Sequence, residues 1–358
     1  MFKKFYLLFS VLVVCVAAGG CAILESSDAR GNAGSFIAQN IEGLGTGAYK
    51  SEEITIGKGT GYELSGILTI PEGAAPRGGF PAAVIVHGSG PIDMDGTMFA
   101  YTVYRDLADY LSSSGIVVVR YNKRTFTHGF KMVEELGGSL TVYEETIEDA
   151  VSAANLLKAD PRVNKDKVFI IGHSLGGMLA PRIQVSGGNF SGLILMAGSP
   201  RFLLDLSYEQ NIDYIEKTMS SVDKENAYAS LSGWNDMVNL ILNIPDEDAK
   251  GVDIGGMSAY YLKDLHKHPA ADYIDIVRVP YLVLQGEADF QVRADKDFAL
   301  YKELLAGRNN TAFKSYEGLS HMFIKSTTGY VDEYDTPDHV NIQVLRDIAS
   351  WILGVSRQ

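Results

Sequence analysis

Residues 168–180 read VFIIGHSLGGMLA, and this stretch decides the fold. Its first four residues are apolar and either branched or aromatic, which predicts a buried parallel strand. The pattern G-x-S-x-G follows at once, and a helix-compatible run comes next. Glycines two residues to either side of Ser174 let neighbouring backbone pass where a β-carbon would clash. The stretch therefore predicts a sharp strand-to-helix turn that exposes the hydroxyl of Ser174 at the carboxyl edge of a sheet.

Short apolar runs alternate with helix-compatible runs on both sides of this turn. Such alternation is typical of a parallel sheet covered by helices on both faces. Upstream, apolar and polar residues alternate in two segments that are joined by a glycine-rich turn. This pattern predicts an antiparallel hairpin at the sheet edge. We therefore predict an α/β fold with a mostly parallel central sheet flanked by helices. The strands are expected at 52–56, 62–70, 82–86, 116–121, 168–171, 192–198, 279–286 and 311–316.

The alternation stops between about residues 201 and 275. This segment is polar and helix-prone, with tyrosines and a tryptophan scattered through it. We interpret it as a helical lid insertion that lines one side of a substrate pocket. The alternative, which holds for most of the aromatic residues individually, is that they only pack the lid onto the core.

The N-terminus has the pattern of a targeting segment. Lys3 and Lys4 precede an apolar run too short to span a bilayer comfortably, and Ala-Gly-Gly-Cys ends at Cys21. Residues 1–20 are therefore predicted to be a bacterial lipoprotein signal, with cleavage before Cys21 and lipid on its sulfur. The alternative is a plain secretory signal cut nearby. We expect an exported protein anchored to a bacterial membrane, with a flexible tether at 21–48 and one folded domain at 49–358.

Composition narrows the possible functions. The chain has 31 Lys and Arg against 44 Asp and Glu, a net charge of −13, and no basic cluster, which argues against nucleic acid as a partner. Of its two cysteines, Cys15 leaves with the signal and Cys21 would carry lipid, so no disulfide is expected. The acidic residues within 144–149 follow a capping box that begins at Thr141. They are expected in a first helical turn, where negative charge is stabilised, and we predict no metal site.

A serine hydroxyl needs a base to take its proton and an acid to orient that base. Asp289 lies just past one expected strand and His321 lies in a loop past the next. Both should therefore reach the same carboxyl edge of the sheet as Ser174. Glu287 is the competing carboxylate, but its position predicts that it tilts away from this edge. His173 is expected to point from the opposite side of the turn, as a structural histidine.

A second glycine turn follows the expected strand at 82–86. In this architecture the turn supplies half of an oxyanion hole, so the backbone N–H groups of Ser89 and Leu175 are the predicted donors. His87 is interpreted as a structural residue that holds the loop, with a role as base as the alternative.

Four motifs occur in a specific order: HGSGP at 87–91, RYNKR at 120–124, GHSLGG at 172–177 and QGEADFQV at 285–292, with His321 after them. With these motifs the chain resembles the α/β-hydrolase superfamily, and bacterial carboxylesterases in particular, over roughly residues 50–355. The resemblance implies hydrolysis of a small-molecule ester through an acyl-enzyme, with no metal or organic cofactor. The ester itself stays open, because the lid is the part with the fewest motifs.

Two other functions are compatible with these residues. A serine peptidase of the prolyl-oligopeptidase type shares the catalytic domain, but the roughly 50 residues before the sheet are too few for its propeller domain. A non-catalytic surface lipoprotein could use the same pocket to bind a ligand, although the complete set of Ser174, Asp289 and His321 argues against this.

Overall fold

The computed structural model of the protein describes residues 44–357. The predicted signal segment 1–20, the lipid site Cys21 and most of the predicted tether lie outside the described residues. The end of that tether, residues 44–48, is held against the domain. The N–H of Gly45 donates to Ser114 Oγ (3.0 Å), and the N–H of Gly47 donates to the carbonyl of Ser113 (2.9 Å). Within 44–357, no helix combines the length and apolar character needed to cross a bilayer.

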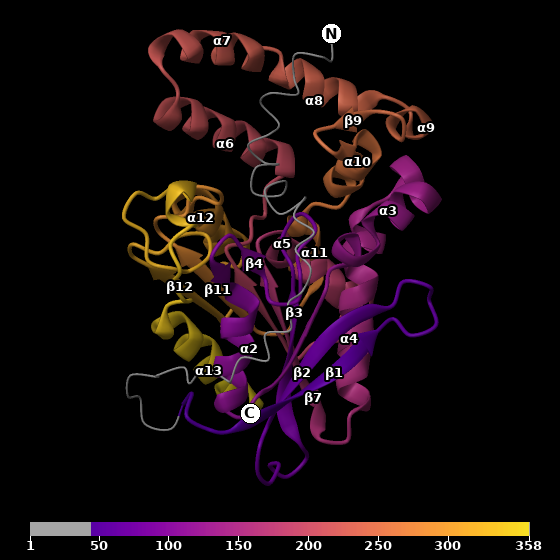
Figure 1. Ribbon diagram of the computed structural model, residues 1–358, viewed down its shortest axis with the longest axis vertical. Coiled ribbons are helices and arrows are strands. Elements are labelled where there is room, and N and C mark those ends of the chain that lie inside the picture. Colours follow the sequence, from indigo (N-terminus) through magenta and orange to yellow (C-terminus); the bar gives the residue numbers. More distant parts are fainter. Residues whose placement is uncertain (1–43, 358) are drawn as a thin grey trace.

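The centre of the described chain is an eight-stranded sheet with the order β1-β2-β6-β3-β7-β8-β11-β12 (Figure 1). The strands from β6 to β12 pair in parallel, whereas β1 and β2 form the predicted antiparallel hairpin and β2 pairs antiparallel with β6. The strands are β1 (Tyr49–Ile56), β2 (Leu64–Pro71), β3 (Phe80–Val86), β6 (Val117–Tyr121), β7 (Val163–His173), β8 (Gly192–Met196), β11 (Tyr281–Gly286) and β12 (Thr311–Tyr316).

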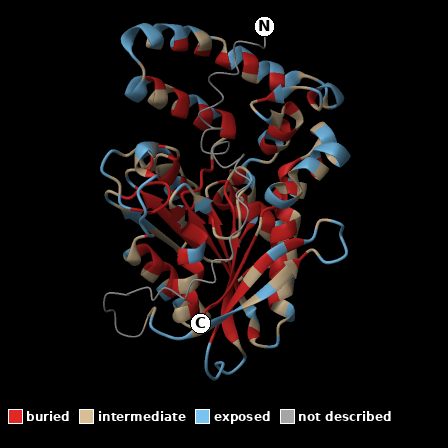
Figure 2. Ribbon diagram, in the orientation of Figure 1, coloured by how far each residue is buried: buried red, intermediate tan, exposed pale blue. Residues whose placement is uncertain are grey.

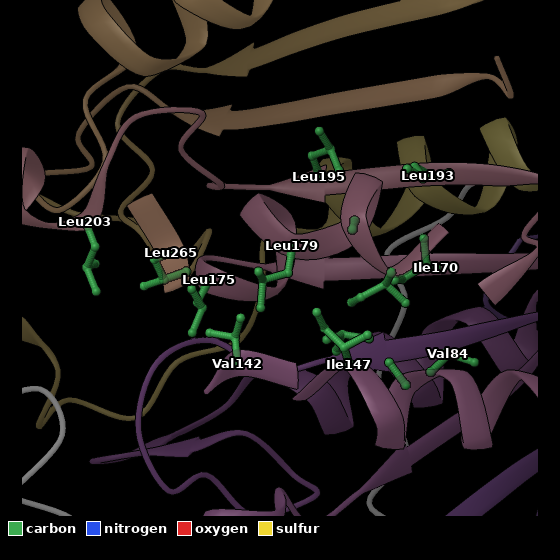
Figure 3. Packing of buried hydrophobic residues seen from close by; sticks show 14 of the residues in the cluster. Val84, Val142, Ile147, Ile170, Leu175, Leu179, Leu193, Leu195, Leu203 and Leu265 are labelled. Atoms are coloured by element: carbon green, nitrogen blue, oxygen red, sulfur yellow. The ribbon is translucent and has the colours of Figure 1, made fainter. Parts of the chain in front are cut away.

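Alternate residues of the central strands face two separate cores. On β3, Val84 belongs to the core built with α4 and α5, whereas Ile85 belongs to the core built with α2 and α13. Strands β3, β6, β8 and β11 are buried along their length, as are residues 168–173 of β7 (Figure 2), which explains their largely apolar sequence. Figure 3 shows side chains of the first core around Val84 and Ile170. The helices that cover the sheet are α2 (Val103–Ser113), α4 (Glu148–Ala159), α5 (Leu175–Ile183), α12 (Ala299–Leu304) and α13 (Ile342–Ser356).

Helices fill the segment between β8 and β11, where the sequence predicts the lid. In Figure 1 most of them lie above the sheet as a separate layer, with α6 and α7 on one side and α8 to α10 on the other. They are α6 (Leu203–Thr218), α7 (Ser221–Leu231), α8 (Trp234–Asn243), α9 (Asp246–Ala249), α10 (Ala259–Lys267) and α11 (Ala270–Ile276), with the short strands β9 (Asp253–Ile254) and β10 (Met257–Ser258). Two further short strands, β4 (Thr97–Met98) and β5 (Tyr101–Thr102), precede α2.

The segment after α3 (Arg124–Leu136) differs in detail from the prediction. Glu144 does reach back to the N–H of Thr141 (3.0 Å), as in a capping box, but a π-helical turn precedes α4. Two acidic residues expected to be stabilised by the helix terminus alone are instead buried in ion pairs. Glu145 pairs with Lys123 at 3.0 Å, and Asp149 pairs with Arg124 at 2.5 Å. Because both partners lie at the start of α3, the local sequence of the helix that carries the acidic residues did not indicate the pairing.

Candidate active site

Ser174 sits at the predicted turn between β7 and α5 with φ 54° and ψ −118°. A non-glycine residue in this conformation costs about 1–3 kcal/mol and is held there by its surroundings. A β-carbon on Gly172 would lie 2.2 Å from the carbonyl oxygen of Gly176, and one on Gly176 would lie 2.4 Å from that of Val86. Both positions therefore require glycine. The N–H of Ser174 donates to the Met196 carbonyl (2.9 Å), which ties the turn to β8.

Asp289 and His321 form a buried pair at the carboxyl ends of β11 and β12. His321 Nδ1 lies 2.8 Å from Asp289 Oδ2, and the two side chains are 2% and 0% exposed. With the Nδ1 proton donated to the carboxylate, Nε2 is left as the acceptor of the ring. Glu287, the competing carboxylate, and Asp289 both line a separate depression on the surface, but it is the carboxylate of Asp289 that contacts His321 Nδ1.

Three further donors fix the carboxylate of Asp289. The side-chain amide of Gln285 donates to Oδ2 (2.9 Å), and the N–H groups of Gln291 and Val292 donate to Oδ1 (2.8 and 2.9 Å). The QGEADFQV motif is therefore a carboxylate cradle, since its first residue and its last two residues all bind the aspartate between them. This arrangement orients Asp289 toward His321.

One cavity brings most of the predicted site residues together. Ser174, His321, Ser89 and Leu175 all line it, and Asp289 lies behind His321. Its volume is about 70 Å³, well below the roughly 300–1,000 Å³ typical of sites for drug-sized ligands. Most of the remaining wall is apolar and comes from the oxyanion turn region, β4, α2, α5, α6, the loop after β11 and the His321 loop. These apolar residues are Ile92, Met98, Val103, Met178, Leu203, Leu206, Val292 and Met322.

The turn at 87–91 packs directly against the nucleophile. A β-carbon on Gly88 would lie 3.1 Å from Cβ of Ser174. Within residues 44–357, no group accepts a hydrogen bond from the N–H of Ser89. Leu175 is the first residue of α5, and the first N–H groups of a helix have no partner within it. The helix N-terminus at Leu175 favours an anionic oxygen beside Ser174.

We had predicted that His173 points away from the site, but it does not. Its ring centroid lies 4.9 Å from that of His321, and its Nε2 donates to the His321 carbonyl (3.1 Å). Its Nδ1 lies 3.3 Å from the hydroxyl of Tyr104, which also accepts a hydrogen bond from the N–H of Gly88 (3.1 Å). These bonds join the oxyanion turn to the His321 loop. The predicted direction was wrong because the direction of a side chain at a turn depends on packing partners from distant segments, whereas these bonds fit the predicted structural role.

His173 is uncharged at its position beside His321. Burial, and to a lesser degree the neighbouring His321, lower the pKa of His173 to about 3. The ring is therefore neutral at physiological pH, and it places no second positive charge beside His321 when that residue takes up a proton.

His87 has the structural role that we had inferred. Its Nε2 donates to the carbonyl of Tyr121 (2.6 Å), and burial lowers its pKa to about 3. No group of three or more His, Cys, Asp or Glu side chains in the described part of the chain is arranged to hold a metal ion.

Solved structures share this fold. Est1E from Butyrivibrio proteoclasticus, solved with ferulic acid bound, superposes with a TM-score of 0.52 at 15% identity, over 85% of this chain and 100% of that chain. A Mycobacterium tuberculosis puromycin-hydrolyzing peptidase superposes with a TM-score of 0.52 at 19% identity, over 86% of this chain and 39% of that chain. At such identities the likeness shows the fold alone. The predicted α/β-hydrolase fold is confirmed.

Sequence comparison identifies the family to which the chain belongs. Residues 92–327 match the protein family described as serine aminopeptidase, S33. Esterase EstD of Thermotoga maritima is 32% identical over 312 residues, which cover 86% of this chain and 68% of that relative. The chain therefore belongs to this α/β-hydrolase family, as the four motifs had indicated, and it is a hydrolase.

Proposed function

We propose that this protein is a serine carboxylesterase in which Ser174 is the nucleophile, His321 the general base and Asp289 the acid that orients it. The observation that carries the proposal is the 2.8 Å contact between Asp289 and His321 beside the cavity that Ser174 also lines. The similarity to a relative named as an esterase supports esters as substrates.

The proposed reaction uses these groups in turn. Ser174 Oγ attacks the ester carbonyl carbon while its proton passes to His321 Nε2, and the carbonyl oxygen becomes an oxyanion held by the N–H groups of Ser89 and Leu175. The bond to the alkoxy oxygen then breaks, and the departing alcohol takes the proton from His321. A water molecule repeats the sequence on the acyl-enzyme and releases the acid. Asp289 stabilises the imidazolium in both halves.

Replacing the nucleophile tests the proposal. Ser174→Ala should abolish hydrolysis of p-nitrophenyl acetate and labelling by a fluorophosphonate probe, while the protein stays folded. A Ser174→Ala protein that still turned over the ester would place the nucleophile elsewhere. Failure of the native protein to react with the probe would favour a non-catalytic ligand-binding lipoprotein.

The cavity supports short acyl groups as the substrate class. It is small, and methyl-bearing side chains such as Met178 and Leu206 form much of its wall. We expect the ratio kcat/KM to be highest for acetyl to butyryl esters and to fall for longer chains. A maximum at octanoyl or longer esters would contradict this substrate class.

A peptidase activity is the second candidate, because the matched family is described as serine aminopeptidase. The same residues would attack an amide, so only the substrate separates the two functions. Hydrolysis of aminoacyl-naphthylamides should be compared with hydrolysis of acetyl esters in the same preparation. A higher kcat/KM for the amides would replace the esterase proposal with a peptidase.

We also propose that the mature protein is exported and tethered to a bacterial membrane by lipid on Cys21, as the N-terminal pattern predicts. Labelled palmitate should be incorporated into the native protein and not into a Cys21→Ser variant. The variant should also move from the membrane fraction to the soluble fraction. Equal membrane association of both proteins would contradict a lipid anchor.

A further inference from the structure

The peptide groups around Gly88 are held from two sides by buried side chains. The N–H of Gly88 donates to the hydroxyl of Tyr104 (3.1 Å), and the carbonyl of Gly88 accepts from Lys123 Nζ (2.8 Å). The Lys123 side chain is only 1% exposed, and it comes from the RYNKR motif at the end of β6. A fully buried ammonium group is costly to desolvate even when a carboxylate lies beside it, so the location of Lys123 calls for a physical explanation.

The carbonyl of Gly88 and the N–H of Ser89 belong to one planar peptide unit. No cis peptide bond occurs in the described chain, so the two groups point in opposite directions. Lys123 lies outside the cavity that Gly88, Ser89 and Ser174 line. A carbonyl held by Lys123 therefore directs the N–H of Ser89 to the cavity side of the turn, where Gly88 packs against Ser174.

We infer that Lys123 is a positioning residue for the oxyanion hole. It fixes the orientation of the Gly88–Ser89 peptide, so that the N–H of Ser89 is already directed at the oxygen that becomes negative in the transition state. Its positive charge also polarises this peptide and strengthens the N–H as a donor. Lys123 forms no bond with the substrate and exchanges no proton in the reaction. This inference rests on the proposed esterase mechanism.

A second contact holds Lys123 in place and reaches the predicted lid. Glu145 Oε1 lies 3.0 Å from Lys123 Nζ, and Glu145 Oε2 accepts from the hydroxyl of Tyr261 (2.6 Å) on α10. Glu145 and Tyr261 are both buried. The oxyanion turn is thereby connected through two side chains to a helix of the segment between β8 and β11. We expect the position of α10 to affect the donor strength of Ser89 through this connection.

A pair of double variants tests the inference. Lys123→Met alone would leave Glu145 as an unpaired buried charge and risks unfolding the protein. The test variant is therefore Lys123→Met with Glu145→Gln, which removes both charges. The matched control is Arg124→Met with Asp149→Asn. This control removes the neighbouring buried ion pair and leaves Glu148, the second partner of Arg124, which is 41% exposed. In the described chain, neither Arg124 nor Asp149 has a side-chain hydrogen bond to residues 87–91.

The readouts are kcat and KM for p-nitrophenyl acetate and the inhibition constant of a trifluoromethyl ketone, whose adduct with the serine carries an oxyanion. Active sites are counted with a fluorophosphonate, so that only folded protein enters the rate. Because deleting one oxyanion donor costs about 10²- to 10³-fold in rate, misdirecting one should lower kcat by roughly 10- to 100-fold. KM should change little, and the affinity for the ketone should fall with kcat.

The possible outcomes separate this inference from the proposed function. Equal losses in the test and control variants, or a test variant with the native kcat and ketone affinity, would overturn the role of Lys123. A loss of active-site titre with native kcat per remaining site would also overturn it, because it would show a purely structural contribution. Failure of the esterase proposal would give a different result. The native protein would not hydrolyse the ester, or it would hydrolyse the ester equally well without the Ser174 hydroxyl.

Discussion

At the scale of single residues, the candidate catalytic residues could be predicted from the sequence, but the contacts of the residues around them could not. Ser174 was identified from the glycines around it, and Asp289 and His321 from their places after successive strands. The structure brings the last two within 2.8 Å of each other. The contacts of His173 and Lys123 could not be predicted, because their partners lie in the His321 loop and the oxyanion turn. Only folding brings those segments to the same place.

The role of Asp289 can be separated from that of a general negative charge. Asp289→Asn should lower kcat by about 10⁴-fold, as in serine proteases where this change holds the histidine in the wrong tautomer. Glu287→Gln removes a carboxylate two residues away, outside the cavity, and should leave kcat within about twofold of native. Steady-state kinetics on p-nitrophenyl acetate measures both variants. Similar rates for the two variants would show that Asp289 does not orient the base.

At the scale of elements, the helices after β8 show what a sequence pattern can and cannot determine. The loss of strand alternation after residue 200 indicated a helical segment, and helices α6 to α11 occupy it. Which of them would reach the cavity was not predictable, since several carry apolar and aromatic residues. The structure gives this role to α6 through Leu203, Leu206 and Gln210. Gln210 also donates to the carbonyl of Gln291 (2.9 Å), which joins α6 to the loop that holds Asp289.

Helix α6 should therefore set the limit on acyl length. Leu206→Ala enlarges the cavity wall, and we expect the best acyl chain to lengthen by two or more carbons while acetate turnover falls. The matched control is Leu231→Ala on α7, because Leu231 is as buried as Leu206 but does not line the cavity. Both variants should lose roughly 2–5 kcal/mol of stability, so the chain-length profile distinguishes them. Identical profiles would show that α6 does not bound the acyl site.

At the scale of the whole molecule, the sheet is what assembles the site. Strands β3, β7, β11 and β12 each end at the same edge, and the site residues follow those ends. This arrangement was predictable because parallel strands share one carboxyl edge. The buried polar groups that connect these strand ends were not predictable, because each of them pairs with a group from a different strand or helix. Their burial has a consequence for the stability of the entire domain.

Two of these buried groups make the folded state sensitive to acid. Burial lowers the pKa of both His87 and His173 to about 3, against 6.5 for a free histidine. Between these values the unfolded chain binds protons that the folded chain does not bind. The stability that the neutral rings contribute is therefore present above pH 6.5 and is lost as the pH falls toward 3. Each histidine should lower the free energy of unfolding by up to about 1.4 kcal/mol per pH unit in this range.

Urea unfolding at several pH values between 4.5 and 8 measures this dependence. We expect His87→Gln to be less stable than the native protein at pH 8, because the bond to the Tyr121 carbonyl and the ring packing are disturbed. Its stability should nevertheless fall less steeply below pH 6.5, with a slope smaller by about 1.4 kcal/mol per pH unit. The two curves should approach each other in acid. Parallel curves would mean that His87 binds its proton equally well in the folded and the unfolded protein, and that another group causes the loss of stability.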